Sequence, residues 1–180
     1  MQTQRLTAHP AHPPAQVSAI EARIGGPQDG WLRLRWRVEG AGALTLPRFA
    51  GSRRMDGLWR TTCFELFVRE KGSPSYREFN FAPSEAWAAY SFAGYREGMR
   101  EAEIPRAPVI TPRRGRDLLI MDVALRMEGL CDNPLEYGLC AVLEEEGGIL
   151  SYWALAHPPA KPDFHDPACF AATLAPAQQA

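Results

Sequence analysis

Hydrophobic and polar residues alternate along much of this chain, and the alternation is clearest between Trp31 and Glu39. Leucine, tryptophan or valine occupies positions 32, 34, 36 and 38, whereas arginine occupies positions 33, 35 and 37. Successive side chains of a β-strand point to opposite faces of the sheet. A period of two therefore predicts a strand with one buried face and one solvated face.

Segments of the same kind recur at short intervals and are separated by turns rich in glycine and proline. We expect further strands at 16–24, 44–46, 61–69, 76–82, 87–92, 118–127, 135–145, 149–157 and 168–174. The Gly147-Gly148 pair suits a hairpin turn, because glycine readily adopts positive φ. Residues 93–117 contain three prolines and are expected to form a long connection, with one helical turn at most at 99–103.

No long segment shows the 3.6-residue period of an amphipathic helix, so the pattern predicts an all-β fold. We expect a two-sheet antiparallel β-sandwich, jelly-roll or immunoglobulin-like, in a single domain. Residues 1–16 are expected to form an extended lead-in, residues 17–175 the sandwich domain, and residues 176–180 a C-terminal tail.

The three segments 61–69, 76–82 and 87–92 predict two successive hairpins with a definite register. Matching apolar with apolar positions pairs Phe64 with Phe81, Glu65 with Asn80, Phe67 with Glu78, Phe81 with Trp87, and Glu78 with Tyr90. A slip of one residue would turn every side chain to the other face, so the agreement of two hairpins supports this register. One face then collects the core residues Phe64, Leu66, Phe79, Phe81 and Trp87, and the other collects Glu65, Phe67, Tyr76, Glu78, Asn80 and Tyr90.

The second face combines carboxylates, an amide and aromatic rings, which is typical of a carbohydrate-binding surface. Aromatic rings stack on the apolar faces of sugars, and carboxylates and amides bind pairs of hydroxyl groups. We expect hydrogen bonds from Glu65, Glu78 and Asn80, stacking on Trp59, Tyr90 and Trp153, and a contact from His157 at the rim.

Other interpretations of the same residues remain open at this stage. The face is also compatible with a solvated outer surface, or with an aromatic surface that docks another protein. Two neighbouring carboxylates, Glu65 and Glu78, are compatible with glycoside hydrolysis, although nothing in the sequence gives either one a raised pKa. Haem ligation would need an axial pair drawn from Met55, Met99 and His165.

Composition further limits the kinds of partner that we expect. The chain has 180 residues and a net charge of −1, which gives no electrostatic reason to expect nucleic acid as a partner. No apolar run approaches the length of a membrane span, and no N-terminal signal peptide is recognisable, so a cytoplasmic protein is expected. The four cysteines lack zinc-site spacing, and Cys63 and Cys140 lie in apolar strands where free thiols are usual. His157, Asp163 and His165 match no metal-ligand spacing, so no metal is expected.

The sequence resembles bacterial DOMON-like proteins, which are related to the family 9 carbohydrate-binding modules. The resemblance rests on DGLWRTTCFELFV (56–68), YREFNFAPSEAWAAYSF (76–92), YREGM (95–99) and WALAHPPAKPDFHDP (153–167). It implies a two-sheet β-sandwich that binds a sugar or a haem and performs no chemistry. In the sugar-binding modules two tryptophans clamp the ligand, a part that Trp59 and Trp153 would take in this chain.

Overall fold

The structure is a computed structural model that describes residues 2–127 and 133–175. Its strands are β1 (Gln2–Ala8), β2 (Ala19–Gln28), β3 (Trp31–Glu39), β4 (Cys63–Glu70), β5 (Tyr76–Phe81), β6 (Trp87–Phe92), β7 (Arg100–Glu101), β8 (Val109–Arg114), β9 (Leu118–Arg126), β10 (Leu135–Glu145), β11 (Ile149–Ala154) and β12 (Ala172–Leu174). The short 3-10 helices are η1 (Ala41–Ala43), η2 (Leu58–Arg60) and η3 (Pro167–Cys169). Within the described ranges there is no α-helix, and therefore none long and apolar enough to cross a membrane.

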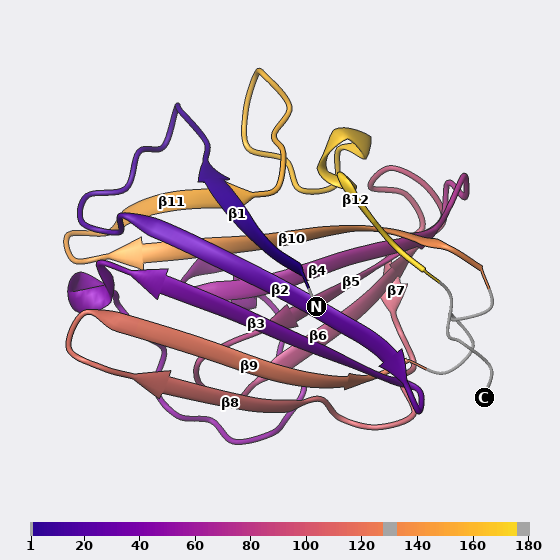
Figure 1. Cartoon of the computed structure of the whole chain (residues 1–180), viewed down its shortest axis with the longest axis horizontal. Coiled ribbons are helices and arrows are strands. Elements are labelled where there is room, and N and C mark those ends of the chain that lie inside the picture. The colour runs from indigo at the N-terminus through magenta and orange to yellow at the C-terminus, as the bar shows by residue number, and fades with distance from the viewer. Residues whose placement is uncertain (1, 128–132, 176–180) are drawn as a thin grey trace.

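The strands form one continuous antiparallel sheet, which curls until its two halves face each other (Figure 1). The strand order is β7-β6-β5-β4-β10-β11-β1-β2-β3-β9-β8, and β12 pairs with β10. Strand β1 joins the halves, because Gln2 to Leu6 pair with β2 whereas Thr7 and Ala8 pair with β11. The predicted all-β antiparallel architecture is confirmed. Two separate sheets were expected, whereas β1 joins the two halves into one continuous sheet.

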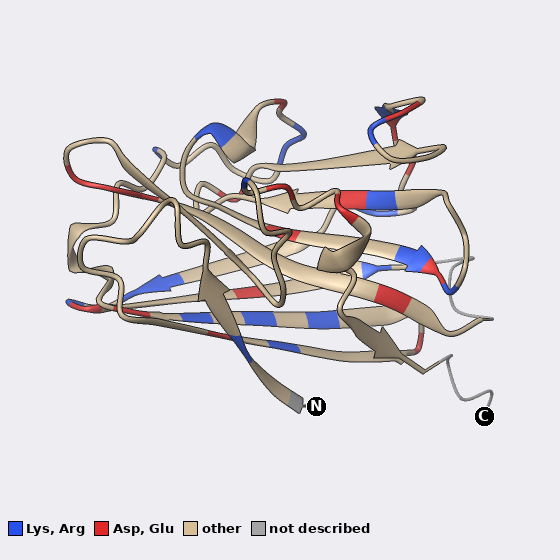
Figure 2. Ribbon diagram, turned by 90° about the horizontal axis from the view of Figure 1, so that it is seen from above, with Lys and Arg blue, Asp and Glu red and all other residues tan. Residues whose placement is uncertain are grey.

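The hydrophobic core lies between the two halves of the sheet. Trp36 of β3 is fully buried. The centroid of its ring lies 5.5 Å from the ring centroid of Phe64 and 6.2 Å from that of Phe81, both in the opposite half. The arginines of β3 point the other way, as its alternation predicted, and rows of basic positions follow the strands in Figure 2. Burying aromatic rings of this size is a large favourable contribution to folding.

The predicted register of the central hairpins is confirmed. Phe64 pairs with Phe81, and Glu65 pairs with Asn80, between β4 and β5. Glu78 pairs with Tyr90 between β5 and β6, as the second hairpin required. The five residues assigned to the inner face all belong to the main core.

Two predictions for irregular segments differ from the structure. The expected lead-in at 1–16 contains β1, which is a full member of the sheet because its alternating residues bury Leu6 between the halves. The expected connection at 93–117 contains β7 and β8, and the helical turn suggested at 99–103 is absent, since Arg100–Glu101 pairs with β6. Strand β8 tolerates Pro112 because it is an edge strand of the sheet. The tail predicted at 176–180 lies outside the described residues.

A buried carboxylate fastens the chain between β1 and β2 to the sheet. Glu145, at the end of β10, is 1% exposed. Its carboxylate accepts hydrogen bonds from the backbone N–H groups of Ala15 at 2.8 Å, Gln16 at 2.6 Å and Val17 at 3.1 Å. Buried backbone donors need partners, and here one side chain supplies three acceptor contacts.

Three cysteines in the described part of the chain, Cys63, Cys140 and Cys169, are free and buried. Burial raises the pKa of the Cys63 and Cys140 thiols well above the ordinary value. The expectation that these two residues are free thiols is confirmed, while Cys131 lies outside the described residues. Thiols in this environment are poor nucleophiles, because the reactive form is the thiolate.

Candidate functional site

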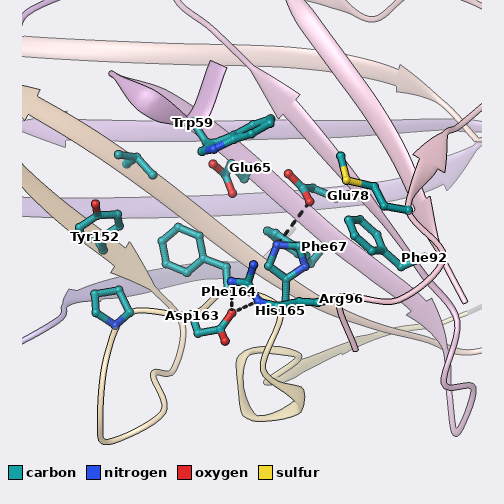
Figure 3. A pocket seen from close by; sticks show the side chains of 13 residues that line it. Trp59, Glu65, Phe67, Glu78, Phe92, Arg96, Tyr152, Asp163, Phe164 and His165 are labelled. Atoms are coloured by element: carbon teal, nitrogen blue, oxygen red, sulfur yellow. Dashed lines mark hydrogen bonds and ion pairs between the residues drawn. The ribbon is translucent and has the colours of Figure 1, made fainter. Parts of the chain in front are cut away.

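A cavity of about 350 Å³ lies over the face of β4, β5 and β6 that points away from the main core. Its floor carries Glu65, Phe67 and Glu78, and Trp59 of η2 stands at one side (Figure 3). Residues 162–165 close it from the opposite side. Cavities of about 300–1,000 Å³ are of the size that holds small ligands in proteins.

The floor of the cavity contains two buried carboxyl groups from neighbouring strands. Glu65 is 2% exposed and Glu78 is 5% exposed. Glu78 Oε1 accepts a hydrogen bond from Asn80 Nδ2 at 2.8 Å, whereas Oε1 of Glu65 has no hydrogen-bond partner. Glu65 and Glu78 come together because Glu65 pairs with Asn80, two positions from Glu78 on β5.

Burial controls the ionisation of both floor carboxyls. It raises the pKa of Glu65 well above the ordinary range, and the neighbouring Glu78 carboxylate adds to the rise. Burial also raises the pKa of Glu78 to about 7, although the hydrogen bond from Asn80 and the charge of Arg96 oppose the rise. An unpaired buried carboxylate is strongly unfavourable, so the floor keeps protons that exposed glutamates would lose.

A covering loop, residues 155–171, packs over this face and is held by ionic and hydrogen-bond contacts. Asp163 is 5% exposed, and its carboxylate accepts hydrogen bonds from Arg96 Nη2 at 2.7 Å, from the Tyr95 hydroxyl and from the His165 N–H at 3.1 Å. The loop approaches the sheet closely at Gly138 of β10, where a Cβ would lie 2.4 Å from the Cys169 carbonyl oxygen. Glycine is therefore required where the loop crosses β10.

His165 of the covering loop lies directly above the floor. One ring nitrogen, Nδ1, lies 2.7 Å from the Tyr76 hydroxyl, and the other, Nε2, lies 3.7 Å from Oε2 of Glu78. Burial and the charge of Arg96 lower the pKa of His165 to about 4, despite the opposing effect of Asp163. The imidazole is consequently neutral near pH 7 and does not neutralise Glu78.

The walls of the cavity are aromatic. Phe67 and Phe164 have ring centroids 6.3 Å apart, and Phe164 lies 6.2 Å from Tyr152 of β11. Trp59 is 38% exposed and lies 6.0 Å from Tyr90 in an edge arrangement. Rings placed around buried polar groups offer both stacking and hydrogen bonding to one ligand.

Some residues of the predicted site line the cavity, and others lie beside it or away from it. Trp59, Glu65 and Glu78 line the cavity, and Asn80 lies beside it, bonded to Glu78. Tyr90 is buried next to Trp59, and its hydroxyl donates a hydrogen bond to Asp56 at 2.6 Å.

Trp153 and His157 lie away from the described cavity lining. Trp153 faces the main core, where its Nε1–H donates to Ser151 Oγ at 2.9 Å, and the adjacent Tyr152 faces the cavity instead. His157 Nε2 lies 2.8 Å from the Thr7 carbonyl oxygen. The sequence analysis chose Trp153 because its ring could stack on a sugar. Successive side chains of β11 point to opposite faces, however, so Tyr152 and not Trp153 faces the cavity.

Several cavity residues were not part of the predicted site, and most of them lie far from β4 and β5 in sequence. Arg96 and Met99 follow β6, and Asp163, Phe164 and His165 belong to the covering loop. The signal available in the sequence was the run of charged and aromatic residues at 161–166. In the structure this run covers the face that carries Glu65 and Glu78.

The haem alternative concerns two residues of the cavity. Met99 and His165 both line it, as the haem alternative would require, but the two nitrogens of His165 already lie against Tyr76 and Glu78. An axial bond to iron would have to displace one of these partners. Among the described residues no group of three or more His, Cys, Asp or Glu side chains is arranged to hold a metal ion.

Comparison with solved structures finds proteins that share this fold. A candidate carbohydrate-binding protein from Bacteroides uniformis superposes with a TM-score of 0.71 at 14% identity, covering 93% of this chain and 83% of that chain. A family 9 carbohydrate-binding module from Caldicellulosiruptor kristjanssonii in complex with cellotriose gives 0.52 at 7% identity, covering 84% and 72%. The same kind of module in complex with glucose gives 0.50 at 11% identity, covering 84% and 74%.

These likenesses confirm that the chain shares the fold of the family 9 modules, as the resemblance implied. No family model matches the sequence, and no curated protein sequence matches it.

Proposed function

We propose that this protein binds a carbohydrate in the cavity between β4, β5 and the covering loop, without cleaving it. The observation that carries the proposal is Glu65, a 2% exposed carboxyl whose Oε1 lacks a hydrogen-bond partner and which lines an aromatic cavity. Buried polar groups are normally satisfied, so an orphaned oxygen on a residue that lines a cavity supports a ligand as its partner. Two solved proteins of this fold are described in complex with cellotriose and glucose, which supports the same class of ligand.

The cavity and its lining residues suit a monosaccharide or a disaccharide. Trp59 offers a partly exposed ring face at the side of the cavity, and the Glu65 and Glu78 carboxyls lie below it (Figure 3). The apolar C–H face of a sugar would lie against Trp59, while its hydroxyls would donate to the floor carboxyls. The Arg96 guanidinium and the Asp163 carboxylate line the same cavity and supply further polar contacts.

Titration calorimetry against a panel of monosaccharides and disaccharides is expected to show saturable binding to at least one sugar. The Trp59→Ala variant is expected to weaken that binding about fivefold, since one stacking contact contributes roughly 1 kcal/mol. Phe49→Ala is the matched control, because Phe49 is 76% exposed and does not line the described cavity. Equal losses in both variants would contradict the assignment of Trp59 to the site.

The same protein is expected to leave aryl glycosides intact. Hydrolysis by two carboxyls requires an ionised base or nucleophile beside a protonated acid. Burial here raises the pKa of Glu65 well above its ordinary value and that of Glu78 to about 7, so only part of the protein carries an ionised base near pH 7. Release of nitrophenol that disappears in Glu65→Gln or Glu78→Gln would show catalysis and overturn this part of the proposal.

A further inference from the structure

The two floor carboxyls have no cationic partner in the described part of the chain. No ion pair involves Glu65, and the one ion-pair contact of Glu78 is His165 at 3.7 Å. His165 is neutral near pH 7, because burial lowers its pKa to about 4. Buried carboxylates are ordinarily paired with a cation, and among the described residues no cation that is charged near pH 7 is in contact with these two.

The remaining charged groups of the cavity neutralise each other. Arg96 is the one arginine or lysine among the described lining residues, and its Nη2 lies 2.7 Å from Asp163 Oδ1. The carboxylate of Asp163 is correspondingly stabilised, and its pKa is lowered by hydrogen bonds from Arg96 and Tyr95, which outweigh the opposing effect of burial. Because Arg96 pairs with Asp163, it forms no ion pair with Glu65 or Glu78 in the described part of the chain.

Two buried oxygens at or beside the floor lack hydrogen-bond partners. Oε1 of Glu65 and Oδ1 of Asn80 are both buried without a hydrogen-bond partner. These two residues are paired across β4 and β5. A ligand with several donors and no acceptor, such as an ammonium group with its three N–H bonds, matches such a set better than a hydroxyl, which has one donor.

The aromatic lining favours positive charge as well. Trp59, Phe67, Phe92, Tyr152 and Phe164 line the cavity around the two carboxyls (Figure 3). The faces of aromatic rings carry negative electrostatic potential and attract cations, most strongly where water is excluded. A cavity that combines such rings with buried carboxyls is typical of sites for organic ammonium groups.

We propose, building on the carbohydrate-binding function above, that the ligand carries a protonated amine that is seated between Glu65 and Glu78, as in an amino sugar. The amine would contribute the missing cation and donors, and Trp59 would stack on the sugar ring. Neutral sugars would occupy the same cavity more weakly, since they leave the floor without a counter-charge.

Binding of the ammonium group is expected to release a proton from the floor. The groups facing the two glutamates are His165, Arg96 and Asp163 from the covering side, Tyr76 and Tyr90 from β5 and β6, and Cys63 and Cys140 from β4 and β10. The pKa values of the tyrosines and cysteines are raised and that of His165 is lowered, so these groups keep one protonation state near pH 7. A released proton is therefore assigned to Glu65 and Glu78.

The test compares matched pairs of sugars at about pH 7, where aliphatic amines of this kind are largely protonated. The pairs are glucosamine with glucose, galactosamine with galactose, and mannosamine with mannose, each with its N-acetyl derivative as a third member. At least one amino sugar is expected to bind about tenfold or more tightly than its neutral partner, and N-acetylation is expected to remove the gain. Calorimetry in two buffers of different ionisation enthalpy is expected to give different heats for the amino sugar and equal heats for the neutral one.

Variants separate this inference from the proposed function. Glu78→Gln is expected to remove the preference for the amine, measured as the ratio of the affinities for the amino sugar and its neutral partner, and Glu103→Gln, at an exposed position, is expected to keep that preference. Circular dichroism establishes that each variant is folded. Equal or tighter binding of every neutral sugar would overturn the ammonium proposal and leave carbohydrate binding standing. Binding of no sugar by folded protein would overturn both.

Discussion

Replacing Glu145 by alanine is expected to lower the free energy of unfolding by about 3–5 kcal/mol. The carboxylate is 1% exposed and accepts three backbone hydrogen bonds, from Ala15, Gln16 and Val17. Hydrogen bonds to a charged group are stronger than neutral ones, and deletion of the acceptor leaves the buried Val17 N–H and two partly buried donors without their partner. The loss is expected in urea unfolding as a lower midpoint with an unchanged slope.

Glu146→Ala is the matched control for this prediction. Glu146 is the next residue, it is exposed in the turn between β10 and β11, and its backbone N–H donates to the Ala43 carbonyl oxygen in a contact that the substitution preserves. Its effect is expected to stay within about 0.5 kcal/mol. Similar effects of both substitutions would show that the Glu145 carboxylate does not fasten residues 15–17 to the sheet.

The Glu65→Gln variant is expected to be more stable than the original protein by an amount that grows as the pH rises above 4.5. The pKa of Glu65 is raised above its ordinary value of 4.5, chiefly by burial and then by Glu78. Between the two values the unfolded chain has lost the proton that the folded chain keeps, so the stability of the original protein falls with pH. Glutamine carries no such proton, and the difference is expected to grow by up to about 1.4 kcal/mol for each pH unit.

The pH dependence of the original protein alone could not be assigned to Glu65, because two neighbours of Glu65 also change stability with pH, in opposite directions. The pKa of Glu78 is raised from 4.5 to about 7, which removes stability as the pH rises through that window. The pKa of His165 is lowered from 6.5 to about 4, so stability is lost as the pH falls through that range. Their windows overlap, and their effects largely cancel. The difference between variant and original protein isolates Glu65.

Glu103→Gln is the control for the pH series, because Glu103 is exposed and its substitution is expected to change stability little at any pH. Urea unfolding of all three proteins at several pH values between 4 and 8 provides the measurement. A constant difference between Glu65→Gln and the original protein across this range would show that Glu65 ionises in the folded state as it does in the unfolded chain.

The sequence predicted the local parts of this fold because their information lies within single hairpins. The alternation in β3 and the apolar matches among β4, β5 and β6 specify which side chains share a face, and the structure confirms them. The positive φ values of Gly147 and Gly148 confirm the turn between β10 and β11. Strands β1 and β8 escaped prediction because each is short and polar or interrupted by proline, and their partners lie elsewhere in the chain.

The candidate site, too, was predicted only in the part that depends on neighbouring strands. By itself the sequence determined that Glu65, Glu78 and Asn80 share one face of neighbouring strands, because the period of two and the apolar pairing leave a single consistent register. Only the tertiary structure decided that this face is enclosed, since the covering loop is separated from it by more than sixty residues of sequence. Enclosure turns ordinary glutamates into buried carboxyls with raised pKa values, and it brings His165, Asp163 and Arg96 to them. Desolvation depends on what packs over a residue, which its own strand does not specify.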